Sequence, residues 1–122
     1  MSDTENGKLA GRRILVVEDE FYLAEDLCRA LSEEGADVAG PASNIRKAKA
    51  LIAEQHVDLA VLDVNLKGEL VFPLADELRL QKVPFVFTTG YDDIMIPVEY
   101  QTIERWEKPL ATSKLIKRLA QL

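Results

Sequence analysis

The amino-acid sequence predicts an α/β fold, a doubly wound (βα)5 three-layer sandwich, and three observations carry this prediction. Short apolar runs alternate with amphipathic stretches of helical spacing along most of the 122 residues. The apolar runs, such as residues 59–62, are continuous, which is typical of parallel strands buried on both faces. Strands that alternate with helices favour βαβ units with right-handed crossovers, and the length suits one domain.

The first half of the chain contains three predicted strands and two predicted helices. The strands are the apolar runs at residues 13–17 and 59–62, with a weaker run at residues 37–40 between them. Helices are predicted over residues 21–34 and 45–55, because apolar side chains recur there at the spacing that places them on one helical face.

The second half contains two more strands and two regular helices. Residues 85–88 and 105–107 are predicted strands, and residues 71–81 and 112–121 are predicted helices with an apolar face. Between the two strands, residues 91–104 include a proline and carry only a poor helical stripe. The fourth helix should therefore be short or irregular.

Composition and charge limit the classes of function open to this chain. A formal net charge of −6 argues against nucleic-acid and anionic-membrane partners, and no apolar stretch reaches the ~20 residues that span a bilayer. Residues 1–11 are polar and aperiodic, so we expect a flexible N-terminal tail before a domain over residues 12–122. With Cys28 alone, a disulfide within one chain is excluded, and the acidic N-terminus is unlike a signal peptide, which favours the cytoplasm.

Polar residues follow four of the predicted strands at their carboxyl ends. Glu18 and Asp19 follow the first strand, Asp63 follows the third, Thr89 the fourth and Lys108 the fifth. In open α/β sheets, ligand sites form beyond the carboxyl ends of the strands. If the first and third strands are neighbours, three carboxylates converge on one small pocket. Such a cluster requires a cation or a proton, which indicates a hard divalent metal.

In this order of motifs the chain resembles the receiver domain of bacterial two-component response regulators, over about residues 12–122. The resemblance implies a parallel sheet of strand order 2-1-3-4-5 and a phosphoryl group carried on Asp63 as 4-aspartylphosphate. It also implies a Mg²⁺ ion bound by Asp19 and Asp63, with the backbone carbonyl of Asn65 as a third ligand and Glu18 acting through water. Mg²⁺ keeps several waters and suits such a sparse set of carboxylates.

The resemblance also assigns roles around the acceptor. Lys108 would supply a fixed positive charge opposite the metal, and the Thr89 hydroxyl would donate a hydrogen bond to the phosphoryl group after transfer. Each motif alone has an ordinary structural explanation, since Asp19 could be a helix N-cap and the segments at Thr89 and Lys108 could be simple turns. It is their joint occurrence at one sheet edge that indicates a site.

The resemblance further implies a histidine kinase or a phosphotransfer protein as the phosphoryl donor and an unidentified protein as the target, with homodimerisation on phosphorylation as one possible output. The chain offers no residues for a separate output domain, so we expect a stand-alone regulator that serves as a switch, phosphate shuttle or phosphate sink. We expect no nucleic-acid or membrane partner, and no enzymatic activity beyond its own phosphotransfer and autodephosphorylation.

Two departures from the common receiver pattern concern the residues that are expected to change conformation on phosphorylation. Most receivers carry a Tyr or Phe three residues before the lysine, where this chain has Arg105, and strand alternation puts the neighbouring Trp106 on the opposite face. Residues 84–91, PFVFTTGY, are similar to the motif PFxFATGY of a subgroup of largely single-domain alphaproteobacterial regulators, often served by HWE-type or related HisKA2 kinases. That subgroup lacks the Tyr or Phe three residues before the lysine and has a reduced or mobile fourth helix. Tyr91 then joins Thr89 as a switch candidate, with packing against the short helix as its alternative role.

Three other classes remain as alternatives. A haloacid-dehalogenase-type Mg²⁺ phosphatase also uses a strand-end Asp nucleophile, but it needs a second Asp two residues on, where this chain has Asn65. A flavin module would need a Ser/Thr-rich loop after the first strand, where residues 18–20 are acidic. A pseudo-receiver would bind partners without phosphate, and the complete set of site residues argues against it.

Overall fold

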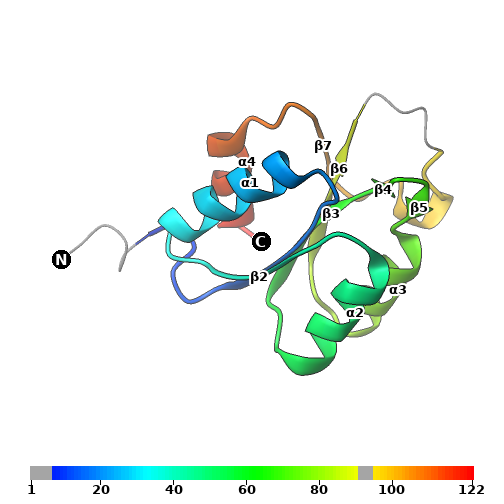
Figure 1. Cartoon of the computed structure of the whole chain (residues 1–122), viewed down its shortest axis with the longest axis horizontal. Helices are drawn as coiled ribbons and strands as arrows, with labels where there is room; N and C mark the ends of the chain where they lie inside the picture. The colour runs from blue at the N-terminus through cyan, green and yellow to red at the C-terminus, as the bar shows by residue number, and fades with distance from the viewer. Residues whose placement is uncertain (1–6, 91–94) are drawn as a thin grey trace.

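The computed structural model describes residues 7–90 and 95–122, and it contains the predicted five-stranded parallel sheet between two layers of helices (Figure 1). The strands lie in the order β2-β1-β3-β6-β7. Because β4 and β5 lie outside this sheet, the order is the predicted 2-1-3-4-5. The five strands are β1 (Arg13–Val17), β2 (Asp37–Ala42), β3 (Leu59–Asp63), β6 (Phe85–Thr89) and β7 (Arg105–Glu107).

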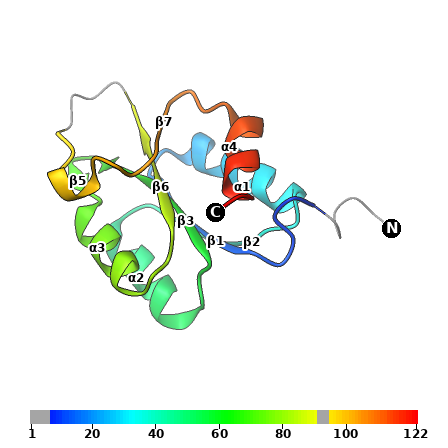
Figure 2. The same cartoon turned by 180° about the vertical axis from the view of Figure 1, so that it is seen from behind.

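Four α-helices form the outer layers. The helices α1 (Phe21–Glu33) and α4 (Thr112–Leu119) cover one face of the sheet, and α2 (Ile45–Glu54) and α3 (Phe72–Leu80) cover the other, as Figures 1 and 2 show from opposite sides. Within the described residues, none of the helices has both the length and the apolar character that a bilayer crossing demands.

Strand alternation divides the core into two clusters. In β1, Ile14 and Val16 pack on the side of α1 and α4, whereas Leu15 and Val17 pack on the side of α2 and α3. Every residue of β3 is buried. The strands are apolar without interruption because both of their faces are covered, which is the pattern that predicted them.

Local signals fix the start of α2 next to the functional edge of the sheet. The Asn44 side chain accepts a hydrogen bond from the Lys47 N–H at 2.8 Å, an N-cap that satisfies one free backbone donor. The Glu69 carboxylate accepts a second one from the Ile45 N–H at 3.0 Å. The loop that follows β3 is thereby joined to the first turn of α2.

A two-stranded hairpin follows β3. Its strands are β4 (Asn65–Leu66) and β5 (Glu69–Leu70), and its two turn residues, Lys67 and Gly68, have φ values of 54° and 92°. Positive φ at both central residues is the geometry of the tight turn that matches strand twist. The Asn65 side chain accepts a hydrogen bond from the Gly68 N–H at 2.7 Å and closes the turn.

The segment between β6 and β7 contains the predicted short helix, the single 3-10 turn η1 (Val98–Tyr100). Tyr100 is buried, and its hydroxyl donates a hydrogen bond to Asp76 of α3. Arg79 of α3 lies 4.4 Å from the centroid of the Tyr100 ring and donates a hydrogen bond to the Glu99 carbonyl. The Tyr100 ring completes an aromatic cluster with three phenylalanines, Phe72, Phe85 and Phe87.

The N-terminal segment differs from the expected flexible tail. Leu9 is fully buried in the cluster beneath α1 and α4, and its N–H donates a hydrogen bond to the Glu34 carbonyl at 2.9 Å. This part of the segment is therefore joined to the domain by the buried Leu9 side chain and by its backbone hydrogen bond to Glu34. Residues 1–6 lie outside the described part of the chain.

Candidate functional site

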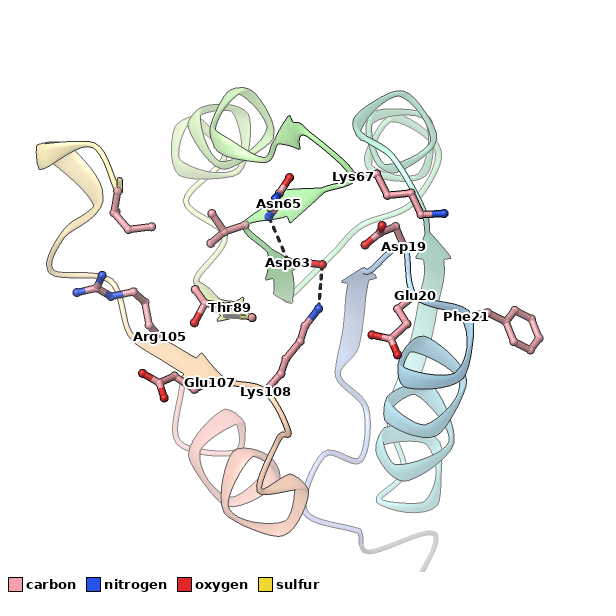
Figure 3. Close-up of a pocket in the computed structure, with 13 residues that line it drawn as sticks. Asp19, Glu20, Phe21, Asp63, Asn65, Lys67, Thr89, Arg105, Glu107 and Lys108 are labelled. Carbon is pink, nitrogen blue, oxygen red and sulfur yellow. Dashed lines mark hydrogen bonds and ion pairs between the residues drawn. The ribbon is translucent and has the colours of Figure 1, made fainter. Parts of the chain in front are cut away.

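The carboxyl ends of β1, β3, β6 and β7 meet at one edge of the sheet and form a pocket there (Figure 3). Parallel pairing sets the alignment, since Asp63 at the end of β3 lies beside Thr88 of β6, and Thr89 lies beside Glu107 of β7. The pocket has a volume of about 900 Å³. Asp63 forms its floor and is only 3% exposed.

Three carboxylates converge at the floor of this pocket, as the sequence predicted. Glu18, Asp19 and Asp63 each offer a carboxylate oxygen, and these oxygens lie within 4.8 Å of one another. Glu18 and Asp63 are buried, and Asp19 is half-buried. Like charges this close disfavour the ionised state of all three at once, unless a cation shares the site.

Lys108 supplies one positive charge to this cluster. Its ammonium lies 2.8 Å from Glu18 Oε1 and 3.0 Å from Asp63 Oδ2. The second oxygen of each carboxylate accepts a hydrogen bond from a backbone N–H, that of Glu20 to Glu18 at 2.9 Å and that of Asn65 to Asp63 at 3.1 Å. Both buried carboxylates are therefore held in fixed orientations by partners from several elements.

The electrostatic environment raises the pKa of Asp63 to about 7. Burial is the main cause and the neighbouring Glu18 charge adds to it, while Lys108 and the Asn65 N–H act in the opposite direction. Burial alone would lower the pKa of Lys108, but its hydrogen bonds and charge interactions with Glu18 and Asp63 raise it above its ordinary value. The site thus retains excess negative charge that one ammonium does not balance.

The donor set fits a hard divalent cation. All of the converging ligand atoms are carboxylate oxygens, the ligands that Mg²⁺ and Ca²⁺ prefer. Both oxygens of Glu18 already accept hydrogen bonds, from Lys108 and from the Glu20 N–H. The two oxygens of Asp63 accept hydrogen bonds in the same way, from Lys108 and from the Asn65 N–H, so these contacts do not rank Glu18 and Asp63 as direct ligands. Asn65 is adjacent in the pocket wall.

The opposite wall of the pocket comes from β6, β7 and the segment between them. Thr89 is half-buried there, and Ile96, Arg105 and Glu107 lie beside it. As predicted, the neighbouring side chains of Arg105 and Trp106 in β7 lie on opposite faces of the sheet. Arg105 aligns with Phe87 and lines the pocket, whereas Trp106 packs in the cluster beneath α1 and α4. Its indole N–H donates a hydrogen bond to Glu104 at 3.0 Å. Tyr91, the second switch candidate, lies outside the described residues.

Sequence reasoning missed part of the pocket wall. Lys67 lines the pocket because the hairpin turns its central residue toward this edge of the sheet, and Glu20 and Phe21 line it from the start of α1. The signal for Lys67 was available, since a Lys-Gly pair between two short apolar-polar segments is a possible hairpin turn. The pairing of Lys108 with Glu18 had no signal in the chain.

Comparisons with known proteins agree with this geometry. The family model of the response regulator receiver domain matches residues 14–120. Sensory transduction protein LytT of Bacillus subtilis is 31% identical over 111 residues, which are 88% of this chain and 46% of LytT. Transcriptional regulatory protein AruR of Pseudomonas aeruginosa is 34% identical over 119 residues, which are 90% of this chain and 48% of AruR. The chain spans about half the length of these curated relatives.

A solved structure gives the same picture in three dimensions. The BeF3-activated conformation of SdrG from Pseudomonas melonis Fr1 is 32% identical, with a TM-score of 0.70. The match covers 91% of this chain and 95% of the solved chain.

Proposed function

The chain belongs to the response regulator receiver family, and we propose that Asp63 is its phosphoryl acceptor in a two-component signalling pathway. One observation carries this proposal. The Asp63 carboxylate is nearly buried at the carboxyl edge of the sheet, with Lys108 at 3.0 Å and two further carboxylates close by. A nucleophilic carboxylate, a fixed cation and a metal-binding acidic pair are the parts that phosphoryl transfer to an aspartate needs.

In this proposal an Asp63 oxygen attacks the phosphorus atom and forms an acyl phosphate, while the bond from phosphorus to the donor breaks and the donor leaves with its electron pair. Mg²⁺, held by Asp19 and Asp63 with the Asn65 carbonyl, and by Glu18 through water, would neutralise charge on the transferred group. Lys108 keeps its contact with Glu18 while its charge faces the phosphoryl oxygens instead of the free Asp63 carboxylate. The Thr89 hydroxyl, from the facing wall, donates a hydrogen bond to the product.

The phosphoryl donor follows from the family in general terms, because receiver domains of two-component systems act with histidine kinases. We propose a kinase of the HWE or HisKA2 type, or a phosphotransfer protein, on the basis of the PFVFTTGY segment at residues 84–91. The single turn of η1 and the absence of an aromatic residue at Arg105 support membership of the corresponding subgroup. Within this proposal Thr89 and Tyr91 are the candidate switch residues.

We further propose that the chain works as a stand-alone regulator whose output is a protein contact, with its only chemistry being phosphotransfer and autodephosphorylation of Asp63. The match to SdrG supports this, since it extends over 95% of that solved chain. A phosphate shuttle or sink would use the same site, and a phosphorylation-dependent homodimer would use the same switch.

Two other functions are weaker. A haloacid-dehalogenase-type phosphatase would need a general acid at Asn65, but the Asn65 side chain closes the hairpin turn by accepting the Gly68 N–H, and an amide does not deliver a proton. A phosphate-independent pseudo-receiver would have no use for an ammonium held between two buried carboxylates.

The test is phosphorylation by a small donor. Incubation of the protein with Mg²⁺ and acetyl phosphate should add about 80 Da, the mass of one phosphoryl group, as seen by intact mass spectrometry. Asp63→Asn should abolish the gain, and Asp26→Asn on the exposed side of α1 should leave it intact. No gain in the wild-type protein would favour the pseudo-receiver. Continuous phosphate release without a labelled protein would favour the phosphatase.

A further inference from the structure

The β4–β5 hairpin begins just after the acceptor and is joined to the domain through both of its strands. The Leu66 side chain of β4 is buried in the core on the side of α2 and α3. The Glu69 carboxylate of β5 accepts a hydrogen bond from the Ile45 N–H of α2 at 3.0 Å. Between the strands, the Asn65 side chain accepts one from the Gly68 N–H at 2.7 Å. The hairpin is therefore fixed at its base, at its edge and at its turn.

The pairing register sets the direction of the Asn65 backbone groups. Asn65 lies opposite Leu70, and in the next pair the Val71 N–H donates to the Val64 carbonyl at 3.0 Å. Because bonded and non-bonded pairs alternate in an antiparallel ladder, Asn65 is in a non-bonded pair, and its N–H and C=O point away from β5. The N–H donates to Asp63 Oδ1 at 3.1 Å, the contact drawn as a dashed line in Figure 3. The carbonyl of the same extended residue therefore points toward the acceptor side as well.

A carbonyl fixed in this direction suits Mg²⁺ better than Ca²⁺. Mg²⁺ demands near-ideal octahedral geometry at short metal–oxygen distances, whereas Ca²⁺ accepts longer and less regular arrangements of ligands. A carbonyl on a loose loop would have to be ordered each time an ion binds, which lowers affinity. A carbonyl already held beside the three carboxylates avoids this loss, and the gain is largest for the ion with the stricter geometry.

We propose that the Asn65 side chain and the turn at Gly68 are positioning elements that hold the Asn65 carbonyl toward the acceptor and make the metal site select Mg²⁺ over Ca²⁺. This inference rests on the proposed function, in which Asp63 and its neighbours hold the ion. It deepens that function, because it assigns roles to a side-chain hydrogen bond and to a backbone conformation that the transfer step itself does not use.

Gly68 allows the turn to be disturbed without changing any ligand of the metal. Its φ of 92° lies in the region that other residues rarely adopt, and a Cβ added there would meet no atom within 4 Å. A larger residue therefore strains the backbone of the turn without a collision. Gly11 provides a matched control, with a φ of 78° and equally open surroundings. It precedes β1, at the sheet edge opposite the pocket.

The experiment measures the Kd values of Mg²⁺ and Ca²⁺ by titrations followed through amide chemical shifts, at one pH and ionic strength. Gly68→Val and Asn65→Ala should raise the Kd of Mg²⁺ by roughly three- to tenfold and that of Ca²⁺ by less than about twofold. Gly68→Asn should lie closer to wild type, because asparagine tolerates a positive φ. Gly11→Val should leave both Kd values unchanged.

A weaker preference for Mg²⁺ in Gly68→Val and Asn65→Ala, with recovery in Gly68→Asn and no change in Gly11→Val, supports the positioning role. An equal rise in the Kd values of both cations overturns it, because a general loosening of the acidic cluster would weaken both alike. Unchanged Kd values also overturn it. If Gly68→Val does not fold, Asn65→Ala decides between these outcomes, since it introduces no backbone strain.

Phosphorylation of the wild-type protein is measured separately, as the mass gained from acetyl phosphate. A protein that binds Mg²⁺ with the expected preference but gains no mass would overturn the acceptor role of Asp63 and not the role of the hairpin. A protein that gains mass but shows the same Mg²⁺ preference in every hairpin variant would do the reverse. The two failures are therefore distinguishable.

Discussion

The Lys108 ammonium lies 3.0 Å from the Asp63 carboxylate, although the two residues are 45 positions apart and lie at the carboxyl ends of β7 and β3, which are not neighbours. β6 lies between β3 and β7, so the lysine side chain reaches across the end of the intervening strand. It also contacts Glu18, at the end of β1. One side chain thus connects three strand ends around the acceptor.

This arrangement predicts that removing the Lys108 ammonium lowers the free energy of unfolding by an amount that depends on pH. Lys108→Met leaves Glu18 and Asp63 buried without a counter-charge and should lower the free energy of unfolding by about 3 kcal/mol at pH 7.5 in metal-free buffer. The loss should be smaller at pH 5, because a protonated carboxyl group needs no partner. Urea denaturation at both pH values measures it, with Lys117→Met as the control. An equal loss at both pH values would point to lost packing instead of unpaired charge.

The raised pKa of Asp63 predicts how stability depends on pH. Between its ordinary value of 3.8 and about 7, the folded metal-free protein holds a proton that the unfolded chain has lost. The free energy of unfolding should therefore fall as pH rises through this window, by an amount on the order of 2 to 4 kcal/mol. Asp58, whose pKa is lowered by the hydrogen bond from the Arg13 N–H, acts with the opposite sign but only below about pH 4.

Urea denaturation of the wild-type protein and of Asp63→Asn in EDTA, from pH 4 to pH 8, measures this effect. The variant lacks the titrating group and should show a flatter profile across the same window. Parallel profiles for the two proteins would mean that Asp63 is ionised throughout.

A divalent metal should stabilise the protein by mass action, because it binds the folded acidic cluster and relieves the repulsion among its carboxylates. Asp19→Ala should remove most of the rise in Tm that millimolar Mg²⁺ produces, as followed by calorimetry. The control Asp26→Ala, an exposed position of α1, should keep the rise. A metal-dependent rise that survives in Asp19→Ala would place the ion elsewhere.

Tyr100 should anchor the η1 segment. Tyr100→Phe removes the hydroxyl that donates to Asp76 while keeping the ring in its aromatic cluster. The free energy of unfolding should fall by about 1 to 2 kcal/mol, and amide exchange at Ile103, whose N–H bonds to the Tyr100 carbonyl, should accelerate. Tyr22→Phe, at an exposed position, is the control and should change neither measurement. No acceleration would show that the ring alone holds the segment.

The same anchor narrows the region where a phosphorylation switch can act. With Tyr100 fixed to Asp76 and Arg79 of α3, slowing of amide exchange by Mg²⁺ and beryllofluoride should concentrate between Thr89 and Pro97. Tyr91→Ala should weaken this response more than Trp106→Phe, since Trp106 packs on the far side of the sheet. A response erased by Trp106→Phe alone would require a route through α4.

The sheet and the floor of the site were predictable from local patterns. Runs such as Leu59–Asp63 read as buried strands because both faces are covered, and the end of such a strand places Asp63 at the ligand edge. The boundaries of the helices agree within one or two residues, since their apolar faces end where the packing ends. The weak stripe across residues 91–104 predicted a short or irregular helix, and the described residues of that stretch contain the 3-10 turn η1.

Other features depended on contacts that no local pattern encodes, or on a local signal that was weak. Leu9 is a single apolar residue in a polar stretch, and only the assembled core shows that it is buried. Lys67 adopts a positive φ that lysine rarely favours, so its hairpin was overlooked. Glu18 was expected to act through a metal-bound water, and its direct ion pair with Lys108 arises from the fold, across four strands of the sheet.

Trp106 is the only tryptophan of the chain, and its position makes it an intrinsic optical reporter. Its indole is held by Glu104, and its strand partner Thr88 lies directly beside Asp63. Lys108, which contacts Asp63, follows two residues later on the same backbone, so the indole lies close in the chain to the cation of the site. We expect indole emission of the unlabelled protein, excited selectively over its three tyrosines, to report on occupancy of the acceptor from one known position in the fold.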